Sequence, residues 1–255
     1  MTRVVGHRGA AGLAPENTLA AFDAGIVAGA DAVECDVHMS RDGQLVVIHD
    51  PDVSRTTDGM GNVGQLTLSE LRKLNASVRF AGDSFRPQRI PTLADVLQLA
   101  RGRCAIQIEV KTCAGVRYEG IEQAVVDTLT REGSLDSAQI ISFDWETVRR
   151  LRRLLPNLPL GLLATSRTLP SSLRRDPKAL AALASSAGAS FLGLERKYLQ
   201  PAHRSVTKAS GLGIAVWTVN DVNDMDLFVG QQLDAITTDR PDLLRGVLDR
   251  RAGST

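Results

Sequence analysis

Side chains that can move protons or hold a cation gather near the start of the chain. They are His7, Arg8, Glu34, Asp36 and His49. Each one borders or interrupts a strand-like apolar run, where folding alone does not require a charge. Imidazoles exchange protons near neutral pH, and carboxylates bind cations. This combination predicts a catalytic site.

The carboxylates predict a hard metal ion. Side chains alternate between the two faces of a strand, so Glu34 and Asp36 share one face, and Gln107, Glu109 and Lys111 share a face of another strand-like run. Three carboxylates at strand ends would repel one another and raise their own pKa values unless a positive charge lay among them. A set of oxygen ligands favours Mg²⁺ or Ca²⁺ over zinc, which prefers His and Cys.

An alternation of strands and helices is expected to position these groups. Helical patterns lie between eight strand-like runs, near 3–8, 32–37, 104–111, 138–143, 159–164, 191–195, 213–219 and 234–238. Alternation over this length predicts a closed (β/α)₈ barrel, with a doubly wound open sheet as the alternative. Chemistry in such a barrel lies at the carboxyl ends of the strands, which is where we expect His7, Glu34, Asp36, Glu109, Glu195 and Trp217.

Several helix starts are marked by capping chemistry. The first helix is expected over about 17–29, and an alanine-rich helix over 179–190. Good first-turn or capping residues stand at Asp144, Pro177, Asp221 and Pro241. Asp239, before Arg240 and Pro241, is also interpreted as a helix cap.

The segment 38–90 is too long for an ordinary strand-to-helix connection. We interpret it as a small insertion after the second strand, within a single domain that spans 1–255. The turn at Arg41-Asp42-Gly43 predicts a hairpin that pairs 37–40 with 45–49 and brings His49 over the barrel mouth. Thr67 and Glu70 form a capping box that predicts a short helix.

Composition narrows the classes of partner. The 255 residues carry a net charge of +1, and the basic residues are dispersed. This pattern disfavours binding to nucleic acid or to a membrane surface through a basic patch, and leaves a small molecule as the expected partner. Cys35, Cys104 and Cys113 have no CxxC spacing, which favours a reducing compartment. The sequence shows neither a secretion signal nor a run of about 18 apolar residues. We therefore expect a soluble, cytoplasmic protein without a transmembrane segment; the sequence gives no signal for its oligomeric state.

Each candidate residue also has a structural interpretation. We expect His38 and His203 to be structural histidines. Glu195 is either a further pocket acid or a partner for Arg196 or Lys197, and Trp217 is either a rim aromatic or a wall of the pocket. Carboxylates at strand ends can also cap helices or pair with basic residues, and for Glu109 that partner would be Lys111.

Taken together, the motifs resemble the glycerophosphodiester phosphodiesterase family over nearly the whole chain. The resemblance rests on their order: His7-Arg8-Gly9, Pro15-Glu16-Asn17-Thr18, Glu34-x-Asp36-Val37, Asp42-Gly43, His49-Asp50, Glu109-x-Lys111, Val216-Trp217-Thr218-Val219-Asn220 and Thr238-Asp239-Arg240-Pro241. It implies a (β/α)₈ barrel with a small insertion after the second strand, and hydrolysis of glycerophosphodiesters to an alcohol and glycerol 3-phosphate. In this family, positions that match Glu34, Asp36 and Glu109 bind a divalent metal, and those that match His7 and His49 act as acid and base.

The remaining candidates follow from the chemistry of a phosphodiester anion. Arg8 and Lys111 are expected to stabilise the charge on phosphoryl oxygens, and Trp217 to wall the glycerol moiety. Glu16 and Asn17 are expected to position His7 and Arg8.

Two other functions stay open at this point. One is a lysophospholipase D type activity on lysolipids, and the other is a non-catalytic metal or phosphate binding module. The order of proton transfer between the histidines, the first nucleophile and the head-group preference also stay open.

Overall fold

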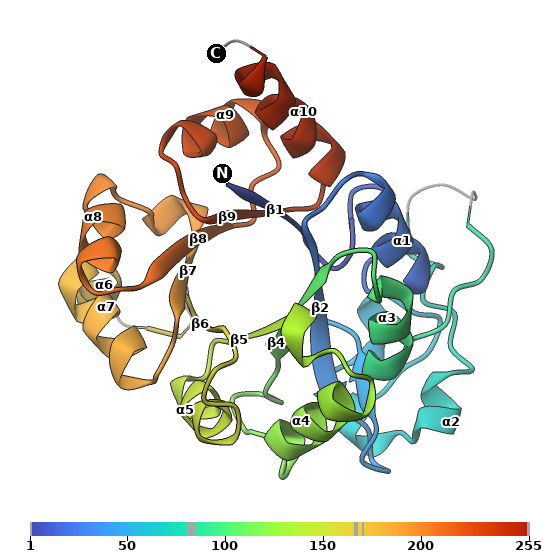
Figure 1. Ribbon diagram of the computed structural model, residues 1–255. Helices are drawn as coiled ribbons and strands as arrows, with labels where there is room; N and C mark the ends of the chain where they lie inside the picture. Colours follow the sequence, from blue (N-terminus) through green and yellow to red (C-terminus); the bar gives the residue numbers. More distant parts are fainter. Residues whose placement is uncertain (1, 81–84, 166–167, 170, 254–255) are drawn as a thin grey trace.

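Eight parallel strands close into a barrel in the computed structural model of the protein (Figure 1). The structure describes residues 2–80, 85–165, 168–169 and 171–253. The barrel strands are β1 (Arg3–Gly6), β2 (Ala32–Met39), β4 (Ala105–Val110), β5 (Ala138–Ser142), β6 (Leu160–Ala164), β7 (Phe191–Glu195), β8 (Gly213–Trp217) and β9 (Ala235–Thr238). β1 pairs with both β2 and β9, so the sheet closes on itself and the open-sheet alternative is wrong.

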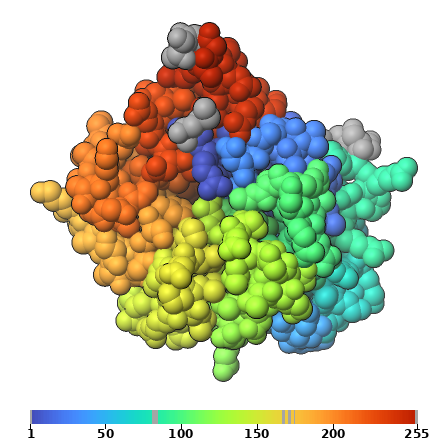
Figure 2. All heavy atoms as spheres, viewed as in Figure 1, coloured from blue at the N-terminus to red at the C-terminus, as the bar shows by residue number. Residues whose placement is uncertain are grey.

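Helices surround the barrel. They are α1 (Leu19–Val27), α3 (Leu93–Ala100), α4 (Ile121–Arg131), α5 (Trp145–Leu154), α6 (Ser171–Arg174), α7 (Pro177–Ser186), α8 (Pro201–Ala209), α9 (Val222–Gly230) and α10 (Pro241–Ala252). The space-filling view shows the chain circling the molecule once, from blue to red, so that its first and last units are neighbours (Figure 2). This is the arrangement that the alternating strand and helix patterns predict.

β2 illustrates how the sequence pattern builds the barrel. All of its residues except Met39 are buried, because helices cover its outer face and barrel side chains fill its inner face. Val33, Cys35 and Val37 join the main apolar core. Glu34 and Asp36 alternate with them and therefore point into the barrel.

The helix starts follow the capping chemistry with one exception. Thr18, Asp144 and Asp221 accept hydrogen bonds from the first turns of α1, α5 and α9, and Pro177 and Pro241 lie in the first turns of α7 and α10. The prediction that Asp239 caps a helix is wrong. Arg240 precedes α10 without a capping side chain, and the carboxylate of Asp239 lies in the site described below.

Between β2 and α3 the chain forms a small unit beside the barrel. β3 (Leu45–Val47) runs antiparallel to β2, with Val37 opposite Val47, as the hairpin prediction requires. Two short 3-10 turns (Val53–Arg55 and Val63–Gln65) and α2 (Leu68–Leu71) follow, and Thr67 and Glu70 form the expected capping box. Seven buried side chains make a separate apolar cluster here: Val46, Ile48, Val53, Val63, Leu71, Ala76 and Ile90. Its description as an inserted subdomain over 38–90 stays a prediction.

Two further observations concern the chain as a whole. Cys35, Cys104 and Cys113 are free thiols. Among the described residues, no helix is long and apolar enough to cross a membrane.

Candidate active site

Three carboxylates meet inside the barrel, at the carboxyl ends of β2 and β4. Glu34, Asp36 and Glu109 each place one oxygen within 4.8 Å of the other two, and all three side chains are buried. The parallel register sets Asp36 directly beside Glu109. Alternation along two neighbouring strands is therefore sufficient to gather the carboxylates that the sequence singles out.

Two basic side chains approach the carboxylates. The Lys111 ammonium lies 2.8 Å from Asp36 Oδ1 and 2.5 Å from Glu109 Oε1. Arg8 donates its backbone N–H to Glu34 Oε2 at 2.8 Å, and its Nε lies 3.4 Å from Asp36 Oδ2. Arg8 has a φ of 50°, in the left-handed region that non-glycine residues seldom adopt. The turn after β1 thus directs both the backbone and the side chain of Arg8 to the carboxylates.

The two cations do not compensate the carboxylates evenly. Burial alone would raise the pKa of Asp36, but Lys111 and Arg8 outweigh it and hold that pKa well below its usual range. Burial raises the pKa of Glu34 well above its usual range, and the charges of Asp36 and Glu109 raise it further. Burial also raises the pKa of Glu109, against the opposing effect of Lys111.

This electrostatic imbalance fits a cation. The oxygens of the cluster lie close enough to surround one ion, and a positive charge in addition to Lys111 and Arg8 would relieve the unfavourable ionisation of Glu34 and Glu109. Three carboxylate ligands suit a hard divalent cation. The residues present therefore fit a metal such as Mg²⁺ or Ca²⁺.

His7 is held by a carboxylate from the far end of the chain. Its Nδ1 lies 2.6 Å from Asp239 Oδ1, and Asn220 donates its amide Nδ2–H to Asp239 Oδ2 at 2.5 Å. The backbone N–H of Asp239 donates to Asn220 Oδ1 at 2.9 Å, which further fixes the position of Asp239. Because Nδ1 is engaged, Nε2 is the atom of His7 left for proton exchange in the cavity.

His49 is held by an aspartate in the same way. Its Nδ1 lies 2.6 Å from Asp50 Oδ1, and Arg55 bonds the other oxygen of Asp50. Burial lowers the pKa of His49 to about 4, so the imidazole is neutral at pH 7 and able to accept a proton. His38 donates its Nε2–H to the backbone oxygen of His49 at 3.0 Å, and its Nδ1 lies 2.8 Å from Tyr118 Oη. His38 thus supports the loop that carries His49.

Glu16 and Asn17 anchor the charged groups. Glu16 accepts from Arg8 Nη1 at 2.7 Å and from both terminal nitrogens of Arg55 at 2.9 Å and 2.7 Å. Asn17 donates its amide to Asp36 Oδ2 at 2.7 Å. Its backbone N–H donates to the Arg8 carbonyl at 3.0 Å. Glu16 therefore contacts Arg8 as expected, whereas the side chain of Asn17 holds Asp36, and His7 is held by Asp239.

A cavity of about 760 Å³ joins these groups at the barrel mouth. Its lining includes His7, His49, Lys111 and Trp217. The Trp217 ring meets Phe143 edge to face, with ring centroids 5.4 Å apart. The indole N–H of Trp217 is buried and has no hydrogen-bond partner among the described residues. The cavity therefore has an aromatic wall with one unused donor.

The remaining candidates have structural partners. His203 accepts the backbone N–H of Gln200 at the start of α8, at 3.0 Å. Glu195 accepts from Thr165 Oγ1 at 2.7 Å and pairs with Lys197 Nζ at 2.5 Å. Arg196 pairs with Asp224. Glu195 does not line the cavity among the described residues, which favours the interpretation of Glu195 as an ion-pair partner.

Three groups were not assigned to the site from the sequence. Asp50 and Asp239 stand in motifs that the sequence analysis quotes, directly beside His49 or in the Thr238-Asp239-Arg240-Pro241 run, and each holds a histidine. Gln107 lies two residues before Glu109, is 4% exposed and lines the cavity. Its position on the polar face of β4 was a signal for a site residue.

The fold and the site together define a (β/α)₈ barrel with an acidic, two-histidine centre at its mouth, and the chain is similar to known proteins over nearly its whole length. The family model of the glycerophosphoryl diester phosphodiesterase family matches residues 7–243. A putative glycerophosphodiester phosphodiesterase of Bacillus subtilis is 36% identical, with 94% of this chain and 96% of that protein covered. A glycerophosphodiester phosphodiesterase of Caldanaerobacter subterraneus is 34% identical, with 95% and 96% covered.

Solved structures agree with the sequence relatives. A putative glycerophosphoryl diester phosphodiesterase of Silicibacter pomeroyi superposes with a TM-score of 0.89 at 26% identity, with 99% of this chain and 94% of that chain covered. A phosphodiesterase of Oleispira antarctica, solved with the product sn-glycerol-3-phosphate, gives a TM-score of 0.86 at 28% identity, with 98% and 97% covered. The chain belongs to the glycerophosphoryl diester phosphodiesterase family.

Proposed function

We propose that this protein hydrolyses glycerophosphodiesters to an alcohol and glycerol 3-phosphate with a divalent metal and two histidines. The family match and the named relatives support the reaction. The observation that carries the metal and histidine roles is the shared cavity of His7, His49, Glu34 and Glu109. A phosphodiester needs positive charge for its phosphoryl oxygens and a proton for its leaving alcohol, and this cavity offers both.

In this proposal Glu34, Asp36 and Glu109 hold the metal. When bound, the ion supplies electrostatic stabilisation of the negative charge that develops on the phosphoryl oxygens. Lys111 and Arg8 add positive charge at the same end of the cavity. Asn17 fixes the carboxylate of Asp36 through its amide, and Glu16 fixes the guanidinium of Arg8.

His7 and His49 divide the proton transfers. Each holds its Nδ1 against an aspartate, Asp239 or Asp50, so each presents Nε2 for exchange. One imidazole takes a proton from the attacking hydroxyl and the other gives one to the leaving oxygen. The neutral state of His49 at pH 7 suits the accepting role, which makes His7 the donor.

Trp217 and Phe143 form the wall against which the carbon skeleton of the glycerol moiety packs. An aromatic wall excludes water from the reacting phosphate and strengthens the electrostatic interactions there. A small diester substrate is the expected partner, and a cytoplasmic location stays a prediction from the sequence.

The experiment is to measure glycerol 3-phosphate release from glycerophosphocholine with Mg²⁺, with Ca²⁺ or with chelator. The native chain is compared with His7→Ala and His49→Ala, and with His203→Gln as a matched control far from the cavity. Release that requires metal, is lost in both alanine variants and persists in the control supports the proposal. Turnover of lysophosphatidylcholine alone would reassign the substrate to lysolipids. Metal binding without turnover of either substrate would indicate a binding module.

A further inference from the structure

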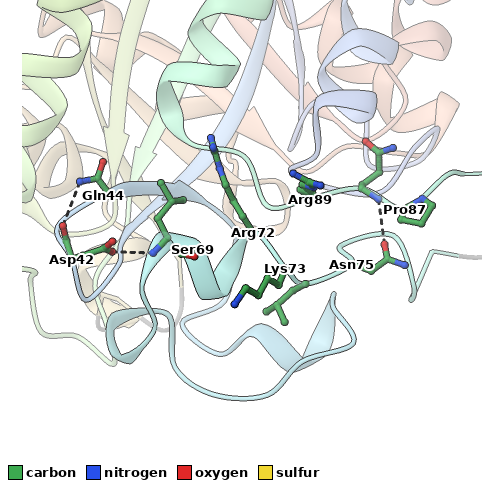
Figure 3. Close-up of a pocket in the computed structure, with 11 residues that line it drawn as sticks. Asp42, Gln44, Ser69, Arg72, Lys73, Asn75, Pro87 and Arg89 are labelled. Atoms are coloured by element: carbon green, nitrogen blue, oxygen red, sulfur yellow. Dashed lines mark hydrogen bonds between the residues drawn. The ribbon is translucent and has the colours of Figure 1, made fainter.

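A second cavity, of about 910 Å³, lies outside the barrel beside α2 (Figure 3). Its walls come from the β2–β3 turn, from α2 and the residues after it, and from the segment 87–89. No lining residue is shared with the catalytic cavity. Its size is that of a small-molecule site, and the proposed hydrolysis makes no use of it.

Three basic side chains line this cavity, which we call the basic groove: Arg72, Lys73 and Arg89. Arg72 is compensated, because its Nη2 lies 2.8 Å from Asp95 Oδ2. Within the part of the chain that the structure describes, neither Lys73 nor Arg89 has an acidic partner within 4 Å. The groove therefore holds two cationic side chains whose charge no protein group neutralises at contact distance.

The acidic groups near the groove are engaged elsewhere. Asp42, on its opposite side from Arg89 (Figure 3), accepts from Ser40 Oγ at 2.6 Å and from the Leu68 N–H at 2.9 Å. Glu70, one turn from Lys73, accepts from Thr67 and pairs with Arg41. Both carboxylates therefore have partners of their own, and neither forms an ion pair with Lys73 or Arg89 within 4 Å.

Neutral groups complete a surface that suits a phosphate ester. The Ser69 hydroxyl lines the groove and makes no protein hydrogen bond among the described residues, so it is available as a donor. Asn75 Oδ1 accepts from the Gln88 N–H at 3.2 Å and ties the two sides of the groove together (Figure 3). Leu68, Leu74 and Pro87 give an apolar patch beside the charges. Guanidinium and ammonium groups with a hydroxyl donor are the usual phosphate ligands, and the apolar patch fits an organic portion.

We propose that the basic groove binds a phosphomonoester dianion. Two unpaired cations match the charge of a phosphomonoester near pH 7, which is close to −2, better than the single charge of a phosphodiester. The phosphate would lie between Lys73 and Arg89, with Ser69 as a further donor and the organic portion over Leu74. This proposal does not depend on the hydrolytic function, because no residue of the catalytic cavity takes part in it.

The test is a calorimetric titration with inorganic phosphate at low ionic strength, in chelator so that no metal in the barrel attracts the anion. The native chain is compared with Lys73→Ala/Arg89→Ala. A matched control, Arg153→Ala/Lys178→Ala, removes two exposed basic residues from α5 and α7. The exchange Lys73→Arg/Arg89→Lys keeps both charges, and circular dichroism checks that every variant is folded.

We expect the groove variant to bind phosphate at least about tenfold more weakly than the native chain, with the control and the exchange within about twofold. Equal affinity in the native chain and the groove variant would overturn the proposal, as would no binding to the native chain at about 20 mM phosphate. Glycerophosphocholine hydrolysis by the groove variant is expected to equal that of the native chain.

The phosphomonoester could be a soluble metabolite or a lipid headgroup, and a second arm separates them. Phosphatidylcholine vesicles with about one fifth phosphatidic acid are sedimented with each variant. If the native chain sediments with these vesicles and the groove variant does not, the dianion is a lipid headgroup. Phosphate binding without sedimentation would assign it to a soluble ester.

Discussion

The two halves of the barrel mouth are built in different ways. On the side of β1, β2, β4 and β9, charged side chains are buried or partly buried and are joined by ion pairs and hydrogen bonds, as Asp36 is to Lys111, Arg8 and Asn17. On the side of β5 to β8, the cavity is lined mainly by apolar groups such as Phe143, Leu163 and Trp217. In the proposed reaction one half carries the chemistry, and the other half gives the pocket its shape.

Substitutions are expected to be more damaging in the charged half than in the apolar half. A buried charge that loses its partner is uncompensated in a medium of low polarity, and the cost is large. An aromatic wall that loses a ring loses contact area, and the cost is smaller and graded. Substitutions in the two halves should therefore differ in both the size and the kind of their effect.

The largest effect is expected for Glu34→Gln, which removes one charge from the carboxylate cluster and keeps its shape. Metal-dependent turnover should fall by on the order of 10³-fold or more, because the cation loses a ligand. Calorimetric titration with Mn²⁺ should show weaker binding, and circular dichroism an unchanged fold. Full activity with unchanged metal affinity would remove Glu34 from the ligand set. Asp144→Asn, a carboxylate of the apolar half, is the matched control.

The next effect is expected for Asp239→Asn, a positioning residue that acts through His7. The amide cannot accept the Nδ1–H of His7 and also keep the donor from Asn220, so the imidazole loses its fixed tautomer. We expect kcat to fall by about 10²-fold or more, with KM changed much less.

The pH profile of kcat distinguishes a positioning role of Asp239 from a purely structural one, because loss of stability alone would not change this profile. In Asp239→Asn the pH profile of kcat should change, whereas Asp242→Asn, at the surface pair with Arg240, should leave the profile as it is. A profile identical to that of the native chain would mean that Asp239 has no influence on His7.

The sequence predicts the fold almost completely, and the reason is periodicity. β2 shows apolar residues at 33, 35 and 37 alternating with acids, and such local patterns place strands within about two residues of their observed ends. β1 ends at Gly6, so His7 and Arg8 lie in the turn rather than in the strand. The turn conformation of Arg8 depends on contacts with β2, which no local pattern encodes.

The charged residues of the site can be predicted from the sequence, whereas the residues that hold them in position are harder to predict. His7 and Asp239 are 232 residues apart in the chain, and Asp239 stands before an Arg-Pro pair, where a helix cap is the local interpretation. The closure of the barrel between β1 and β9 brings these residues together. Asp50 is adjacent to His49, but only the position of Arg55 and Glu16 shows that it belongs to a chain of ion pairs.

A moderate effect is expected on the apolar half, for Trp217→Ala. Loss of the ring removes the wall beside Phe143, and we expect KM for glycerophosphocholine to rise by about tenfold with kcat lowered much less. Trp217→Phe keeps the ring area and removes the unpartnered N–H, so the difference between the two variants measures that donor. A loss of kcat in Trp217→Phe as large as that of Asp239→Asn would contradict the division of the mouth into two halves.

The smallest effect is expected at Asp144, which lines the cavity on the apolar half and caps α5. Its Oδ2 accepts from the Thr147 N–H at 3.0 Å and from the Thr147 hydroxyl at 2.9 Å. Asp144→Ala should lower the free energy of unfolding by about 1 kcal/mol, because two bonds at the helix start are lost, and Asp144→Asn should recover most of it. Urea denaturation measures both. Activity should stay within about twofold of the native chain in either variant, since a capping carboxylate has no part in proton or metal chemistry. A loss of activity in Asp144→Asn at unchanged stability would instead mean that the charge of Asp144, on the apolar half of the mouth, takes part in catalysis.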